Sequence, residues 1–142
     1  MLSLLTIVLI AAAGLAIVLG AYYVYQRMPS HMVAIMPNNS KLYVTDAVEL
    51  SAKKSDAQTL EIGKDAQNAK FVYITNPKTK NSIAWLKSQG FFMAAKALDL
   101  TYEKGLLKHC CGFGYLAADK STMQLKWVTE ASDATVFKFE KL

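Results

Sequence analysis

The stretch from residue 106 to 119, LLKHCCGFGYLAAD, holds the residue types that most often carry chemistry: a histidine, two adjacent cysteines and a Gly-x-Gly motif. If it is a β-strand, alternate side chains point to opposite faces. The bulky face then holds His109, Cys111, Phe113 and Tyr115. The flat face, which leaves room for close packing against a neighbour, holds Cys110, Gly112 and Gly114.

A metal site is not expected in this stretch. A structural zinc ion needs four ligands, usually in two spaced pairs, and the chain has only two cysteines and two histidines. Only His109 and Cys111 could bind from the same face, because His31 is far away in the sequence. Covalent haem attachment needs C-x-x-C-H, whereas this chain has His-Cys-Cys.

Thiol chemistry and catalysis are not expected either. Neighbouring Cα atoms lie about 3.8 Å apart, which is below ordinary disulfide spacing, so Cys110 and Cys111 are interpreted as small buried hydrophobic residues. His109 and Cys110 diverge in a strand, which argues against a nucleophile pair. GFGYLAAD lacks the third glycine of a dinucleotide motif, and no carboxylate pair is obvious. We predict a protein with no catalytic activity, cofactor or metal.

The N-terminal segment predicts a membrane anchor. Residues 2–25 contain no charged side chain, and about 20 apolar residues suffice for a membrane-spanning helix. The small residues that recur every four positions would let a neighbouring helix pack closely; they are Ala12, Ala16 and Gly20. The side chains expected to anchor the helix at the membrane interface are Tyr22, Tyr23, Tyr25 and Arg27.

Composition divides the chain into three parts: a transmembrane anchor (1–28), a connector with two prolines (29–40) and a membrane-proximal domain (41–142). The positive charges that follow the apolar segment favour the cytoplasmic side, or its organellar equivalent, for the C-terminal domain. The alternative is an exported domain on an N-terminal anchor. The predicted localisation is therefore that of a single-pass membrane protein.

The domain has the pattern of an α+β fold: one antiparallel sheet with one main helix. Runs typical of strands occupy 41–45, 59–63 and 70–75. The run from 81 to 100 predicts a helix over 82–98. Alternation returns in 106–118, 123–129 and 134–141, which predicts an antiparallel meander. No internal repeat is visible.

These features favour an accessory, assembly or scaffolding subunit of a larger membrane complex. Its predicted partners are other integral membrane subunits and the lipid bilayer. The net charge of +5 is spread over single lysines and short pairs, which does not indicate nucleic-acid binding. The segment GFFMAA at 90–95 is either a docking patch or core.

Two alternatives remain. An apolar N-terminal helix followed by an antiparallel sheet domain resembles the pilin architecture, and the opening MLSLL is similar to a processed pilin start. That resemblance covers the first thirty residues, has Leu5 where the family has glutamate, and implies a filament subunit. The other alternative is a membrane-tethered ligand-sensing domain, which would contain an apolar cavity of ligand size.

Overall fold

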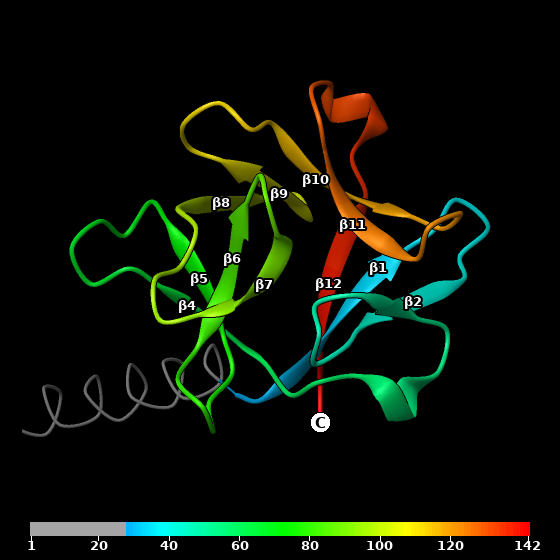
Figure 1. Ribbon diagram of the computed structural model, residues 1–142, viewed down its shortest axis with the longest axis horizontal. Coiled ribbons are helices and arrows are strands. Elements are labelled where there is room, and N and C mark those ends of the chain that lie inside the picture. The colour runs from blue at the N-terminus through cyan, green and yellow to red at the C-terminus, as the bar shows by residue number, and fades with distance from the viewer. Residues whose placement is uncertain (1–27) are drawn as a thin grey trace, which may run out of the picture.

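The computed structural model describes residues 28–142, which fold as antiparallel β-sheet (Figure 1). The strands are β1 (Ser30–Ile35), β2 (Lys41–Val44), β3 (Leu50–Ser51), β4 (Glu61–Lys64), β5 (Val72–Thr75), β6 (Ser82–Leu86), β7 (Gly90–Ala94), β8 (Leu100–Glu103), β9 (Leu106–His109), β10 (Tyr115–Asp119), β11 (Gln124–Val128) and β12 (Val136–Lys141). In this part of the chain the helices are two single 3-10 turns, η1 (Lys54–Asp56) and η2 (Ala131–Asp133).

Six of the strands close into a ring. The sheets follow the orders β12-β1-β2-β3 and β11-β10-β9-β8-β5-β6-β7, with β4 paired to β5. Ser30 and Leu60 exchange two backbone hydrogen bonds of 2.8 Å, which join β1 to the start of β4. The Phe137 N–H donates to the Gly105 carbonyl at 2.8 Å and joins β12 to the start of β9. The resulting ring is β1-β4-β5-β8-β9-β12.

The remaining strands form three hairpins, β2–β3, β6–β7 and β10–β11. A six-stranded ring with three hairpins is the strand order of a β-trefoil. It consists of three four-stranded units: β1–β4 is the first unit, β5–β8 the second and β9–β12 the third. The hairpin turns repeat one backbone feature: Val48, Gly90 and Met123 have φ of 57°, 72° and 55°. The repeat is not visible in the sequence because the three turns share a backbone conformation rather than residue identities.

The core lies inside the ring and draws on all three units. Its largest fully buried side chains are Phe137, Met32, Leu60, Ile74, Leu100, Leu107 and Leu116. Burying one such side chain stabilises a fold by about 1.5–3 kcal/mol. The three units therefore hold one another through a common core.

The predicted α+β class is wrong, because the predicted helix over 82–98 is the β6–β7 hairpin. Ile83 lies opposite Met93 and Trp85 opposite Phe91. Alternate residues of each strand share a face, so this apolar run satisfies a strand pattern as well as a helical one. The left-handed conformation at Gly90 ends the turn and starts β7.

Other predicted strands coincide with observed ones. The runs at 41–45, 59–63 and 70–75 contain or overlap β2, β4 and β5. The last three runs are not a simple meander, because β12 pairs with β1 along its whole length rather than with β11. Residues 29–40, predicted as a connector, contain β1, in which Met32, Val33 and Ala34 are fully buried.

The predicted localisation as a single-pass membrane protein is also corrected. Among residues 28–142 there is no helix whose length and apolar character would let it cross a membrane. The apolar segment 2–25 that prompted the prediction lies outside the described residues.

Candidate functional site

Two groups of predicted site residues lie outside the described part of the chain. The helix-packing group is Ala12, Ala16 and Gly20, and the interface group is Tyr22, Tyr23, Tyr25 and Arg27. Most of the segment that resembles a pilin start lies there too. The predicted membrane subunits and lipid bilayer are not tested by the structure. The third group, Cys110, Gly112 and Gly114, is described and lies in one turn.

The predicted strand over 106–118 is two strands, β9 and β10, joined by a turn at 110–114. Cys110 and Cys111 form a disulfide across neighbouring residues, with their Cα atoms 3.8 Å apart. Ordinary disulfide spacing had argued against this bond, so that expectation was wrong. Positive φ angles at Gly112 (117°) and Gly114 (94°) bend the chain. The alternation of two faces predicted for a continuous strand therefore does not exist.

The glycines of this turn differ in their surroundings. A Cβ atom added to Gly114 would collide with the backbone carbonyl oxygen of Val128, at the end of β11. A Cβ atom added to Gly112 would meet nothing within 4 Å. The close neighbour that the sequence left open is therefore the end of β11, and of the two glycines only Gly114 packs against it.

His109 organises the turn through its ring. Its Nδ1 atom accepts backbone hydrogen bonds from Cys111 (3.1 Å) and Phe113 (3.4 Å). An accepting Nδ1 carries no proton, so the neutral ring holds its proton on Nε2. Burial lowers the pKa of His109, although the negative charge of Asp99 opposes the shift. Both the hydrogen bonds and the pKa favour a neutral histidine.

The turn completes a cluster of aromatic side chains that we call the aromatic surface: Trp85, Phe91, His109, Phe113 and Trp127. The Phe113 ring stacks on His109, with 4.2 Å between ring centroids and 18° between planes, and packs 4.5 Å from Trp85. Trp127 contacts the other four rings at 5.2–6.3 Å. The cluster therefore joins the second four-stranded unit to the third.

This surface is only partly covered. Phe113 is 40 % exposed, and the other four rings are half-buried. The indole N–H of Trp127 is shielded from solvent and has no hydrogen-bond partner in the described structure, a state it shares with Nδ1 of His31. Buried donors are normally paired. The aromatic surface thus combines accessible ring area with an unsatisfied donor.

A central groove borders the aromatic surface where the three hairpins meet. It encloses about 450 Å³. Trp85, Phe91 and Trp127 supply aromatic lining, and the polar side chains at its edge are Glu49, Gln89, Gln124 and Lys126. Glu49 and Gln124 form a β-bridge that ties the first hairpin to the third. All three hairpins therefore contribute to one concave surface.

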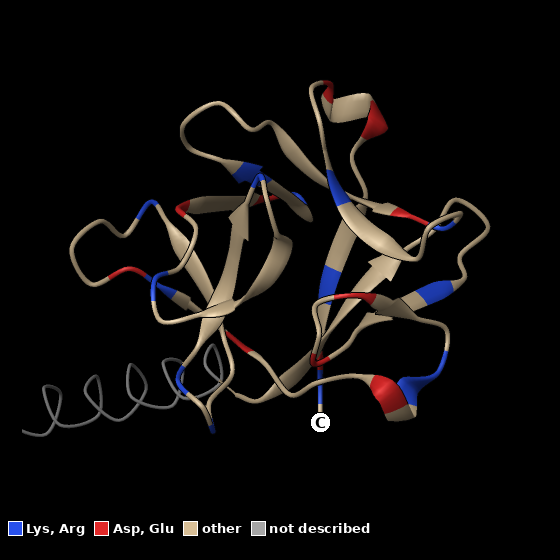
Figure 2. Cartoon of the chain, viewed as in Figure 1, with Lys and Arg blue, Asp and Glu red and all other residues tan. Residues whose placement is uncertain are grey.

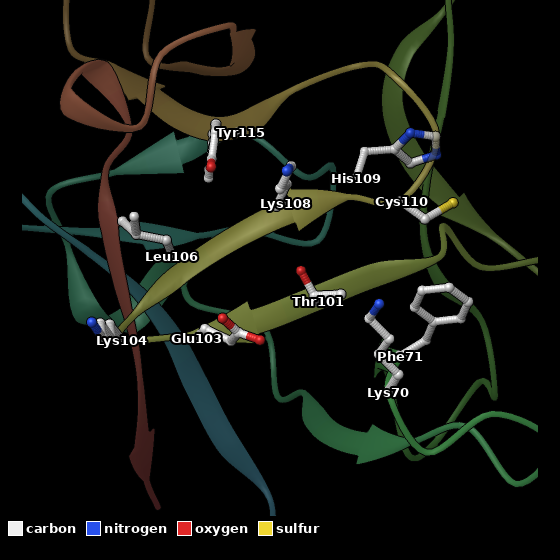
Figure 3. Close-up of a pocket in the computed structure, with 10 residues that line it drawn as sticks. All are labelled: Lys70, Phe71, Thr101, Glu103, Lys104, Leu106, Lys108, His109, Cys110 and Tyr115. Atoms are coloured by element: carbon white, nitrogen blue, oxygen red, sulfur yellow. The ribbon is translucent and has the colours of Figure 1, made fainter.

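A second groove of about 460 Å³ runs along β8 and β9 and is basic (Figure 3). Lys70, Lys104 and Lys108 line it, with Glu103 as its only carboxylate. His109 and Cys110 lie at one end, and Lys104 and Glu103 lie at the other. Over the described residues, basic and acidic side chains are interspersed along the ribbon (Figure 2).

Within residues 28–142, no three His, Cys, Asp or Glu side chains gather in a way that could hold a metal ion. What the structure does bring together is aromatic side chains, and among them Trp85 and Trp127 were not predicted as site residues. Both tryptophans of the chain belong to the aromatic surface. The one sequence feature that could have indicated them is that each tryptophan lies in a short apolar run. Phe91, from GFFMAA, lies half-buried on this surface.

Comparison of the chain with models of known protein families, with curated proteins and with solved structures finds no match.

Proposed function

We propose that residues 28–142 form a non-catalytic binding module, an accessory or scaffolding unit that docks a partner protein through the aromatic surface. The observation that carries this proposal is Phe113. This residue is 40 % exposed in the turn between β9 and β10, and yet its ring packs against His109, Trp85 and Trp127. An exposed ring that is already held in place loses little conformational freedom when a partner covers it.

The composition of the surface supports the same proposal. Tryptophan residues are enriched among the side chains that dominate binding energy at protein interfaces. Trp127 and Trp85 contact each other within the cluster, and both line the central groove together with its polar residues. An apolar centre with a polar rim is the usual anatomy of such an interface.

The proposal is tested with a photo-crosslinking amino acid placed at position 113 and, as the control, at position 136. Val136 is 39 % exposed, so it matches Phe113 in accessibility, and it is not part of the aromatic surface. We expect position 113 to crosslink to one defined partner and position 136 not to do so. Equal crosslinking at both positions would contradict the proposal.

Affinity for the purified partner is then measured with Phe113→Ala and Val136→Ala. Because loss of an interface hot spot typically costs at least 1–2 kcal/mol, we expect Phe113→Ala to weaken binding about tenfold or more. Val136→Ala should change affinity less than about twofold, since it lies outside the apolar centre. The melting temperature of each variant separates a binding defect from a folding defect.

The central groove favours a second candidate, the sensing of a small ligand. The predicted ligand-sensing domain was expected to hold an apolar cavity, whereas this groove is open and combines aromatic rings with two glutamine amides, a carboxylate and an ammonium group. That lining fits a small polyhydroxylated molecule with one apolar face. Saturating titration of tryptophan fluorescence by sugars, abolished by Gln124→Ala, would favour this candidate over protein docking.

A further inference from the structure

The Cys110–Cys111 disulfide lies in a turn that does not need it for closure. In the corresponding turns of the other two units, a backbone hydrogen bond joins the two ends, from Met36 N–H to the Ser40 carbonyl and from Asn76 N–H to the Asn81 carbonyl. Each of these turns also has an inner backbone hydrogen bond, from Asn39 N–H to the Met36 carbonyl and from Lys80 N–H to the Asn76 carbonyl. The third turn has the same bond between its ends, from His109 N–H to the Gly114 carbonyl. In place of an inner backbone bond, its Cys111 and Phe113 N–H groups donate to Nδ1 of His109. Since two turns form without sulfur, the sulfur atoms are available for another role.

The disulfide is accessible to an attacking thiol. Cys111 is exposed, and Cys110 is half-buried and lines the basic groove. The attacking species in thiol–disulfide exchange is an anionic thiolate, and a second thiolate leaves. A positive environment favours thiolates, and the groove that Cys110 lines contains Lys70, Lys104 and Lys108 against one carboxylate, Glu103 (Figure 3).

The turn also connects the sulfur atoms to the aromatic surface. Phe113 lies two residues after Cys111, and both backbone N–H groups donate to Nδ1 of His109. The ring of Phe113 stacks on that same histidine. Opening the disulfide removes a covalent constraint from the segment that holds Phe113 in place.

We infer that Cys110–Cys111 is a reversible thiol–disulfide exchange site, reduced by dithiol compounds or dithiol proteins, whose state sets the position of Phe113 in the aromatic surface. A thiolate of the reductant attacks the sulfur of Cys111, the S–S bond breaks, and Cys110 leaves as a thiolate that takes up a proton. The second thiol of the reductant attacks the mixed disulfide and releases Cys111, which is also protonated. The protein gains two electrons and two protons, and the reductant becomes a disulfide.

The effect on partner binding rests on the proposed function, whereas the exchange chemistry does not. If Phe113 anchors the partner, reduction should weaken binding about as much as Phe113→Ala does, that is, about tenfold. Exchange and movement of Phe113 can be measured with no partner present. A failure of the exchange site therefore appears in the measurements without a partner, whereas a failure of the proposed function appears only in the binding measurements.

The first measurement tests accessibility in the full chain. The protein is incubated with dithiothreitol without denaturant, alkylated and analysed by mass spectrometry. We expect both cysteines to be modified after reduction and neither before it, and removal of the reductant with addition of oxidised glutathione should restore the unmodified state. Alkylation that needs denaturant would overturn the exchange site.

The second measurement follows tryptophan emission, which reports on the aromatic surface because both tryptophans of the chain lie in it. Reduction should shift the emission, and reoxidation should reverse the shift. The double variant C110S/C111S should show the reduced spectrum and no response to dithiothreitol. In Phe113→Ala the response should be lost, and an unchanged response in that variant would overturn the coupling to Phe113.

Discussion

Two turns of the molecule close in the same way with different residues. One runs from Asn76 to Asn81, between β5 and β6, and the other from His109 to Gly114, between β9 and β10. Each closes with a 2.8 Å backbone hydrogen bond between its first and last residues. In each, the first side chain accepts backbone N–H groups of the turn. Asn76 Oδ1 accepts from Lys78 (2.9 Å) and Thr79 (3.2 Å), in the role that His109 Nδ1 has in the third unit.

The difference between the turns lies in what is added. The Asn76 turn contains only polar and proline residues and packs against no aromatic cluster in the described contacts. The His109 turn adds a disulfide, two glycines with positive φ and an exposed ring that joins the aromatic surface. Because the asparagine turn closes without a disulfide or an exposed ring, these two additions are not required for closing a turn of this kind.

The largest expected effect comes from the last residue of each turn. Gly114→Ala should lower the free energy of unfolding by about 3 kcal/mol or more, because strained backbone costs about 1–3 kcal/mol and the new Cβ collides with the Val128 carbonyl. Asn81→Ala should cost less than about 0.5–1 kcal/mol, as for substitutions away from special features. Urea unfolding of both variants makes the comparison, and equal costs would show that the turns are not built differently.

The next effect concerns the side-chain acceptor. Asn76→Ala should lower the free energy of unfolding by about 1–2 kcal/mol, since two backbone donors lose their partner. Asn76→Asp keeps an oxygen at the same place and should cost less. His109→Asn should likewise be tolerated better than His109→Ala, since an asparagine can accept the same backbone hydrogen bonds. If Asn76→Ala is neutral in urea unfolding, the acceptor role assigned to both turns is wrong.

Removing the disulfide should have a smaller effect on stability. A bond between neighbouring residues closes almost no loop in the unfolded chain, so the chain-entropy contribution is small. We expect C110S/C111S to change the free energy of unfolding by about 1 kcal/mol or less. Chemical unfolding of the double variant measures this, and a loss of several kcal/mol would mean that the third turn, unlike the second, depends on sulfur to fold.

The smallest effect is a pH dependence that belongs to the third turn only. The pKa of His109 is lowered in the folded protein, so the unfolded chain binds more protons between that pKa and the usual value of about 6.5. Stability from this group is complete above pH 6.5 and decreases as the pH falls through that window. Subtracting the pH profile of His109→Asn from that of the unaltered protein isolates the contribution. A difference that grows in the opposite direction would contradict it.

Part of the fold could be predicted from the sequence. Alternation in 123–129 and 134–141 identified β11 and β12 because one face of each strand is buried and the other is not. The run at 82–98 was misread because its apolar residues fit a helical period as well as the two-residue period of the β6–β7 hairpin. Local pattern cannot choose between these periods when cross-strand pairs such as Trp85 with Phe91 decide the outcome.

The candidate site was half predicted. The sequence pointed to His109, Cys110, Cys111 and the glycines, because rare residue types are visible in a linear chain. Trp85 and Trp127 were not predicted, because nothing in the local sequence indicates that β6 and β11 place their ring centroids 6.3 Å apart. The disulfide was rejected on average spacing, whereas the bend at Gly112 and Gly114 shapes the turn around it.

By itself, the sequence determined the strand character of segments such as 123–129 and 134–141 and where the reactive residue types lie, since both follow from the order of side chains along the chain. Only the tertiary structure decided that three units close into one ring, that their hairpins meet at a groove, and that a turn places Phe113 on two tryptophans. These features depend on hydrogen bonds and ring contacts between residues far apart in the chain, which no local pattern encodes.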